Sequence, residues 1–114
     1  MRCEIRLLLE DDGGRPFMGV GTLWLLERIV ALASVRQAAL DMGMSYPKAL
    51  RMIRDLERQV GQPVVVRTRG GRAHGGAVLT PYGREFLEGY IELVHELQRT
   101  ADARLADLIP PPGR

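Results

Sequence analysis

The stretch SVRQAALDMGMSYPKALRMIRDLERQVG, residues 34–61, contains two helical patterns separated by a glycine-containing turn. The second pattern has apolar residues at steps of four, three and four, which place them on one face of an α-helix: Ala49, Ile53, Leu56 and Val60. The opposite face carries Pro47, Arg51, Arg54 and Arg58. Ser45 is a good N-cap, Pro47 suits a first helical turn, and Gly61 supplies the stop. The residues therefore predict a one-sided, basic helix over 45–60.

The first pattern, SVRQAALDMG, predicts a shorter helix that Ser34 caps and that stops near Gly43. A short helix, a tight turn and a longer basic helix then follow one another within residues 34–60, which is the helix-turn-helix layout. Ala38 and Ala39 are small at the place where the two helices of this layout approach each other closely. The stretch therefore predicts a helix-turn-helix.

The residues before this stretch predict one strand and one helix. CEIRLLLE (3–10) is rich in apolar residues and precedes the turn-forming DDGGRP, so it predicts a strand. A helix is expected over 22–33, with Thr22 as its cap. Its apolar residues keep helical spacing: Leu23, Leu26, Ile29, Val30 and Ala33.

The residues after the stretch predict a basic hairpin. PVVVRTR (63–69) is β-branched, AVLT (77–80) reads as a returning strand, and the glycine-rich 70–76 joins them. Thr80 as cap and Pro81 in the first turn then open a further helix, which the apolar pattern extends to about residue 108.

This last helix is about 28 residues or 42 Å long, which exceeds what a core of this size covers. Its apolar stripe therefore predicts a second copy of the chain as partner. The predicted dimerisation residues are Leu87, Ile91, Val94, Leu97, Ala101 and Leu105. The alternative is a helix packed on the core at one end and frayed beyond it.

The order of elements is that of a mainly α fold with a small β wing, a winged helix-turn-helix with a long C-terminal dimerisation helix. We expect a winged helix-turn-helix domain over 1–80, with the helix-turn-helix at 34–60 and the wing at 63–80. The long helix covers 81–109, and 110–114 form a tail.

Composition and charge agree with a globular, DNA-facing protein. The chain has 114 residues, long enough for one core, and 46% of them are hydrophobic. Residues 34–74 hold one Lys and seven Arg against three acids, a local net charge of +5 that favours a polyanion partner. One cysteine excludes an internal disulfide, and no apolar run reaches the ~18 residues of a membrane span. We expect no signal peptide and a cytoplasmic protein.

The first turn of the basic helix would enter the major groove, about 12 Å wide, and face base edges. The start of the short helix favours a phosphate, and wing arginines would reach the DNA backbone or minor groove. The predicted contacts with double-stranded DNA are Ser34, Arg36, Gln37, Ser45, Tyr46, Pro47, Lys48, Arg51, Arg67, Arg69 and Arg72.

Residues 3–95 resemble the N-terminal DNA-binding domain of ModE-type molybdate-responsive regulators, which is itself similar to the LysR-type domain. The motifs that carry the resemblance are QAALDMGMSYPKA, PVVVRT, GGRAHGGA and LTPYG. The resemblance implies a DNA role for Ser45, Tyr46 and Lys48, a wing role for Arg69 and Arg72, and homodimerisation through the first and last helices.

Two features depart from that family. Ala33 stands where the family usually has a glycine, before the serine that caps the short helix. The family's molybdate-binding domains do not follow the long helix, so its ligand is not transferred and the effector is unknown. We expect either a stand-alone regulator or a piece of a longer protein.

Other functions have less support in the sequence. Cys3, His74 and His95 lie in three different predicted elements without metal-ligand spacing, so we expect no enzyme, no metal and no cofactor. A winged helix that docks a protein without binding DNA is the alternative function, but the positive charge on both the basic helix and the wing favours DNA. A small anion bound at the dimer interface near Arg99 or Arg104 is a further hypothesis. Ion pairs of these arginines with acids of the same helix are favoured instead. The operator sequence, and whether transcription is activated or repressed, are not encoded in such patterns.

Overall fold

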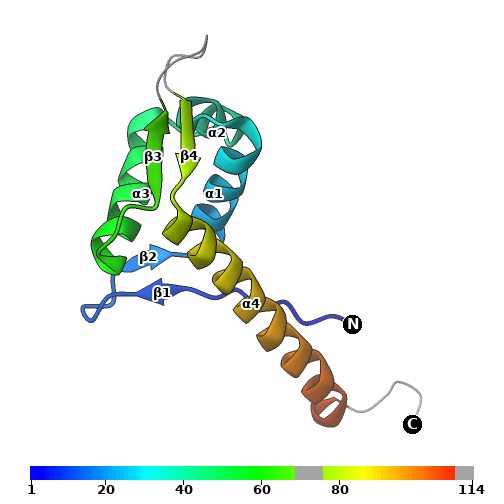
Figure 1. Ribbon diagram of the computed structural model, residues 1–114. Helices are drawn as coiled ribbons and strands as arrows, with labels where there is room; N and C mark the ends of the chain where they lie inside the picture. Colours follow the sequence, from blue (N-terminus) through cyan, green and yellow to red (C-terminus); the bar gives the residue numbers. More distant parts are fainter. Residues whose placement is uncertain (69–75, 110–114) are drawn as a thin grey trace.

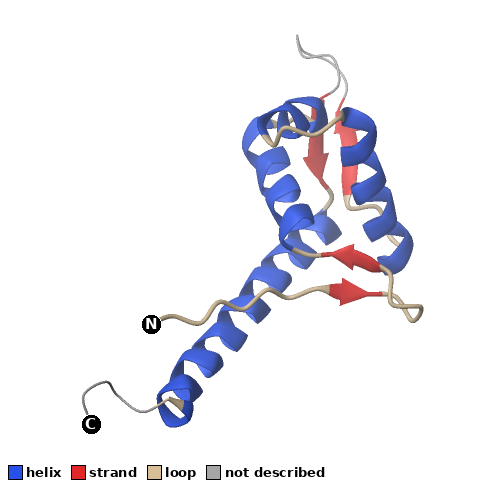
Figure 2. Ribbon diagram, turned by 180° about the vertical axis from the view of Figure 1, so that it is seen from behind, coloured by secondary structure: helices blue, strands red, loops and turns tan. Residues whose placement is uncertain are grey.

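The computed structural model describes residues 1–68 and 76–109 (Figure 1). Within them the elements are β1 (Leu9–Glu10), β2 (Pro16–Met18), α1 (Val20–Leu32), α2 (Val35–Asp41), α3 (Tyr46–Val60), β3 (Val65–Thr68), β4 (Gly76–Leu79) and α4 (Pro81–Leu108). Helices α1, α2 and α3 and the β3–β4 hairpin form one body, from which α4 projects (Figures 1 and 2). The predicted mainly α winged helix-turn-helix is confirmed.

The helix-turn-helix forms as its capping residues predict. Ser34 Oγ accepts a hydrogen bond from the backbone N–H of Gln37 (3.1 Å), and Ser45 Oγ accepts one from that of Lys48 (3.2 Å). Gly43 ends the turn after α2 with a φ of 68°, and Gly61 ends α3 with a φ of 72°. Both helices therefore start and stop at residues suited to those positions.

The core lies between α1, α2, α3 and the hairpin. The two small residues of α2, Ala38 and Ala39, are buried there, as their predicted role at the close helix contact requires. The predicted apolar face of α3 is buried at three positions and half-buried at the last: Ala49, Ile53, Leu56 and Val60. The largest fully buried side chains are Met18, Leu25, Leu26, Ile29, Leu56 and Val64.

The predicted start of α1 is wrong. The helix begins at Val20 after Gly19, which makes no side-chain cap, and Thr22 is buried within the helix. Only Gly19 separates the buried Met18, the last residue of β2, from the helix, so Thr22 lies past the helix start and has no capping role. At the other end Ala33 takes a left-handed φ of 55°, a conformation that costs a residue with a Cβ about 1–2 kcal/mol.

The predicted strand over 3–10 is also wrong for most of its length. Only Leu9–Glu10 pairs, antiparallel, with Pro16–Met18, a short strand that the sequence pattern did not reveal. The turn between them is held by Asp11, whose Oδ1 accepts hydrogen bonds from the N–H groups of Gly13 and Arg15 (both 2.9 Å). Residues 3–8 run alongside α4 instead of pairing with a strand in the part of the chain that is described (Figure 2).

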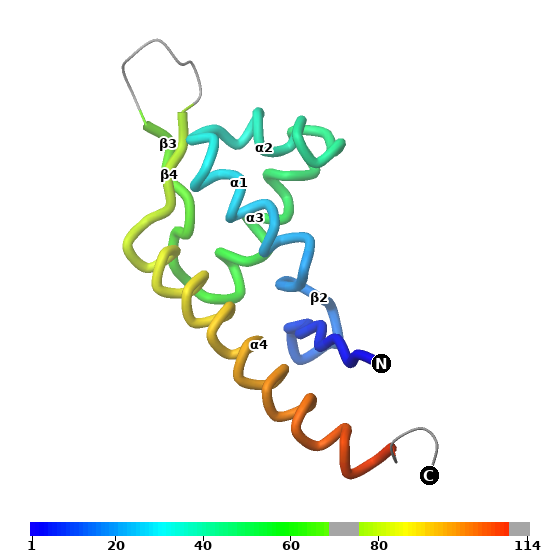
Figure 3. The backbone as a smooth tube through the Cα atoms, turned by 90° about the vertical axis from the view of Figure 1, so that its right-hand side faces the viewer, coloured from blue at the N-terminus to red at the C-terminus, as the bar shows by residue number. Residues whose placement is uncertain are grey.

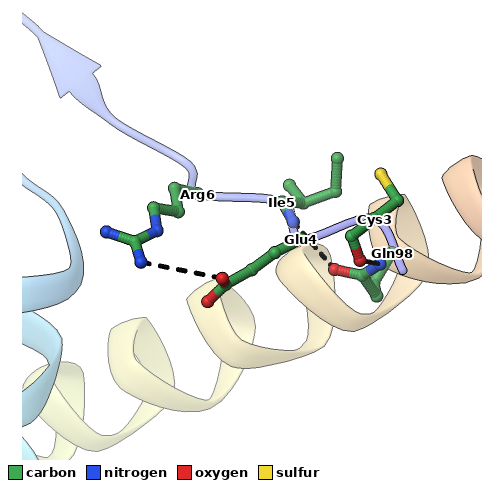
Figure 4. A network of polar contacts seen from close by, with 5 residues as sticks. All are labelled: Cys3, Glu4, Ile5, Arg6 and Gln98. Atoms are coloured by element: carbon green, nitrogen blue, oxygen red, sulfur yellow. Dashed lines mark hydrogen bonds and ion pairs between the residues drawn. The ribbon is translucent and has the colours of Figure 1, made fainter. Parts of the chain in front are cut away.

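A glutamine side chain replaces the missing strand partner. Gln98 on α4 accepts a hydrogen bond from Ile5 N–H (2.8 Å) at Oε1 and donates from Nε2 to the carbonyl oxygen of Cys3 (2.6 Å; Figure 4). Nearer the core, the hydroxyl of Tyr90 donates to the carbonyl oxygen of Leu7. The N-terminal segment therefore covers part of the apolar stripe of α4, which the sequence alone left without a partner inside the chain.

The wing and the long helix follow the predicted order. β3 and β4 are antiparallel, with Val65 opposite Leu79 and Thr68 opposite Gly76. Thr80 caps α4 by accepting from the N–H of Gly83 (2.8 Å), which confirms the predicted start at Pro81. The wing tip predicted at 70–76, with Arg69, Arg72 and His74, lies outside the described residues except for Gly76. No helix in the described residues is long and apolar enough to span a membrane.

Candidate nucleic-acid interface

Three elements present their polar ends at one end of the molecule, opposite the C-terminal end of α4. They are the start of α2, the start of α3 and the Thr68 end of β3 (Figures 1 and 3). The backbone ties the hairpin to the start of α2, because Ala77 N–H donates to the carbonyl oxygen of Ala33 (2.9 Å) beside the Ser34–Gly76 bridge. The hairpin is therefore anchored directly in front of α2.

The predicted contact residues on the helices lie at this end and are accessible. Arg36, Gln37, Ser45, Pro47, Lys48 and Arg51 are exposed, whereas Ser34 and Tyr46 are half-buried. Both serine Oγ atoms already accept the capping hydrogen bonds, so each retains its hydroxyl hydrogen for a further contact. The serines therefore hold the helix starts and remain able to donate to an oxyanion.

Tyr46 connects all three elements. The Cζ of Arg36, from α2, lies 4.0 Å from the centroid of the Tyr46 ring, and that of Arg67, from β3, lies 6.0 Å from it. Arg67 also donates from Nη2 to the Tyr46 hydroxyl. The sequence predicted three separate contacts, and the structure places them in one cluster. Lys48 and Arg51 have no such side-chain partner among the described residues.

The positive charge of this end is not neutralised. The ion pairs of the described residues are Arg6–Glu4, Arg28–Asp41, Arg58–Asp55 and Arg104–Asp107. None of them involves Arg36, Lys48, Arg51, Arg54 or Arg67. Further along α3, Arg58 is paired with Asp55 at 3.1 Å, so the unpaired cations are concentrated toward the start of the helix.

Glu57, near the other end of α3, holds the strand that carries part of this site, and the sequence analysis missed it. Its Oε2 accepts hydrogen bonds from the N–H groups of Val64 (2.8 Å) and Val65 (3.2 Å), at the start of β3. Thr80, which follows β4, donates from its hydroxyl to the carbonyl oxygen of Pro63 (2.7 Å), which precedes β3. Glu57 thus fixes the wing relative to α3. The signal available was an acid on a mainly basic helix, one turn before Gly61.

Groups suited to other chemistry are not gathered anywhere in the described part of the chain. No cluster of three or more His, Cys, Asp or Glu side chains there could hold a metal ion. Cys3 lies beside the distal half of α4, and His95 is exposed on that helix. Burial raises the pKa of the Tyr90 hydroxyl, which lies on α4 away from this end of the molecule.

A basic recognition helix held beside a two-stranded hairpin defines a winged helix-turn-helix domain of the DNA-binding class. Residues 21–84 match the family model of bacterial regulatory helix-turn-helix proteins of the lysR family, and the chain belongs to that family. The resemblance of its motifs to the DNA-binding domain of ModE-type regulators is confirmed.

Individual relatives agree with this assignment. The chain is 37% identical over 89 residues to the molybdenum-pterin-binding protein MopB of Rhodobacter capsulatus, covering 78% of this chain and 32% of the relative. It is 36% identical over 107 residues to the transcriptional dual regulator ModE of Escherichia coli, covering 94% and 40%. The chain therefore spans a third to two-fifths of these proteins.

A solved structure confirms the fold. The DNA-binding domain of CbnR, determined in a complex with DNA, superposes with a TM-score of 0.60 at 24% identity, covering 81% of this chain and all of that domain. This likeness establishes the winged helix-turn-helix fold.

Proposed function

We propose that the protein acts as a homodimer on a palindromic operator, with α3 of each protomer in the major groove and the β3–β4 wing beside it on the backbone. The observation that carries this is the unpaired positive charge gathered at one end of α2, α3 and β3. DNA supplies the matching negative charge, one phosphate per ~1.7 Å of duplex axis.

The side chains of α3 divide by position. Lys48 and Arg51 are exposed one turn apart near the start of the helix, where recognition helices approach base edges. Both residue types donate to the acceptor atoms of guanine, so we assign base contacts to them. The exposed Arg54 lies further along the helix and is assigned to the phosphates.

The dimer surface is assigned to the faces of α4 and α1 that remain exposed. On α4, Leu93, Leu97 and Leu108 are 43%, 38% and 77% exposed, and at ~100° per residue they fall on one side of the helix. On α1, Trp24 is 50% exposed. Of the six residues predicted for this role, Leu87 is buried within its own chain; Leu97 is exposed, and the other four are half-buried.

The dimer fixes the geometry of the operator. Two recognition helices related by a twofold axis read half-sites about 34 Å, or one duplex turn, apart, or a multiple of that distance.

Since the chain spans only part of its molybdenum-related relatives, no effector is assigned to it. A bacterial regulator of this kind works in the cytoplasm, where the chromosome lies. No residue of the chain is assigned a catalytic role.

The test is fluorescence-anisotropy binding to a labelled duplex from the gene's own upstream region and to a scrambled duplex, at two salt concentrations. Tight, salt-steep binding that favours the upstream sequence is expected, because phosphate contacts set the salt slope and base contacts set the preference. Equal binding to both duplexes would contradict an operator in that region. Absence of binding from a folded dimer would favour the protein-docking alternative.

A further inference from the structure

The arrangement around Tyr46 goes beyond a general basic surface. One face of its ring is covered by the guanidinium of Arg36 at 4.0 Å, the distance of a close cation–π contact. Its hydroxyl accepts a hydrogen bond from Arg67. One face of the ring and an acceptor lone pair of the hydroxyl of this half-buried residue are therefore already used inside the protein.

The same contacts bring two positive charges onto one ring. Like charges repel, and neither Arg36 nor Arg67 has a carboxylate partner within the described residues. The rest of the wing offers none, because the sequence of residues 69–75 contains no Asp or Glu. Two guanidiniums that contact the same ring and have no counter-charge form a site that an anion completes, and their planar donor groups match a phosphate.

We propose that Arg36, Tyr46 and Arg67 form a single site for a backbone phosphate of the bound DNA. Tyr46 is its positioning residue: it aims one arginine from α2 and one from the wing at the phosphate, and it reads no base. The site rests on the proposed function, and it makes the wing and the helix-turn-helix bind the backbone as one unit.

The site assigns Tyr46 a role opposite to that of its neighbours. Lys48 and Arg51 lie on the same helix, are exposed and are assigned to base edges. Loss of a base contact weakens binding to the operator more than to random DNA, whereas loss of a phosphate contact weakens both alike. The two roles are therefore separable by comparing two duplexes.

The experiment measures binding of Tyr46→Ala, Tyr46→Phe, Arg36→Ala and Arg67→Ala to the upstream and scrambled duplexes over a range of salt concentrations. Tyr46→Ala is expected to weaken both complexes by the same factor. Each arginine variant should lower the slope of log K against log salt by up to about 0.9, the contribution of one phosphate contact, and Tyr46→Ala by a similar amount. Tyr46→Phe keeps the ring under Arg36 and should lie between wild type and Tyr46→Ala.

A double-mutant cycle separates positioning from a general structural effect. Adding Arg36→Ala to Tyr46→Ala should cost less than the two single losses combined, and the same should hold for Arg67→Ala. Arg51→Ala is the matched control on the same helix, and its loss should add to that of Tyr46→Ala and fall mainly on the upstream duplex. A thermal melt of each variant checks that it is folded.

Three results would overturn the site. A Tyr46→Ala loss confined to the upstream duplex, with the salt slope unchanged, would make Tyr46 a base reader. Additive losses with both arginines would mean that the three residues act independently. Tyr46 variants that bind both duplexes as well as the wild-type protein does would mean that Tyr46 positions nothing. If the wild-type protein itself binds neither duplex, the proposed function is overturned, which is a different result.

Discussion

Gly83 lies against the backbone of Val64 so closely that no larger residue fits. A Cβ atom on Gly83 would be 2.3 Å from the carbonyl oxygen of Val64 and 3.1 Å from its carbonyl carbon. The same oxygen accepts a hydrogen bond from Thr80 N–H (2.9 Å), so it is held in place. This contact fixes the direction in which α4 leaves the wing.

The first prediction compares two glycines of the same helix. Gly83→Ala should destabilise the fold by about 1–3 kcal/mol, because the new methyl group forces the backbone apart. Gly89→Ala should stabilise it by about 0.5–1 kcal/mol, since nothing lies within 4 Å of the added Cβ and alanine favours the helix. Urea unfolding measures both, and a Gly83→Ala variant at least as stable as wild type would contradict the close contact.

The second prediction concerns Glu57, which ties α3 to β3. Glu57→Ala should cost about 2 kcal/mol of unfolding free energy, because it removes a charged acceptor from two backbone N–H groups near the buried Val64. Asp55→Ala is the control on the same helix: it removes only the exposed pair with Arg58, worth less than about 1 kcal/mol. Equal losses in chemical denaturation would show that Glu57 is an ordinary surface acid.

The third prediction concerns the stability at alkaline pH. Burial raises the pKa of the Tyr90 hydroxyl above 10.0, so the folded protein favours the neutral phenol. The stability gained is complete below pH 10 and is lost as the pH rises through 10 toward the folded pKa. Thermal melts from pH 8 to pH 11 should therefore fall more steeply for wild type than for Tyr90→Phe. Parallel curves would mean that Tyr90 does not contribute.

Local signals account for most of the fold. The caps at Ser34, Ser45 and Thr80 were predictable because each is a hydroxyl residue directly before a helical apolar pattern, and each accepts the expected hydrogen bond. Thr22 met the same rule and failed, because the helix begins two residues earlier, at Val20, and Thr22 is buried within it. A capping signal describes a possible start, whereas tertiary packing decides which start is used.

Long-range contacts account for what the sequence did not reveal. The N-terminal segment has the composition of a strand, but its backbone partners are the side chains of Gln98 and Tyr90, more than eighty residues away. Likewise, Arg36, Tyr46 and Arg67 were each predicted to touch DNA, yet nothing in their spacing indicates that they meet. The assignment of individual DNA contacts and of the dimer surface stays a prediction.

The fourth prediction separates base contacts from other positive charges on α3. Lys48→Ala and Arg51→Ala should each weaken binding to the operator by about 1–3 kcal/mol and bind scrambled DNA almost as well as wild type. Arg58→Ala is the control, because its guanidinium is paired with Asp55 and lies further along the helix. Anisotropy titrations on both duplexes give the values. Equal losses for Lys48→Ala on operator and scrambled DNA would rule out base reading by Lys48.

The fifth prediction concerns the exposed apolar side of α4. Leu93 and Leu97 lie one turn apart there, and Leu93 also lines an apolar groove with Leu7, Leu9 and Phe86. Burying a leucine side chain contributes about 1.5–3 kcal/mol, and a carboxylate in its place adds a desolvation cost. The double variant Leu93→Asp, Leu97→Asp should therefore be monomeric at concentrations where wild type is a dimer, as sedimentation equilibrium would measure.

Leu40→Asp supplies the control for this dimer surface, because Leu40 is 72% exposed on α2, in the body from which α4 projects. It should leave the mass unchanged, since an exposed charge there meets no partner. If the α4 double variant dissociates, its affinity for a full palindrome should fall to that for a single half-site, while its salt slope per protomer is retained. A wild-type chain that is monomeric at tens of micromolar would defeat the assignment of α4 as the dimerisation helix.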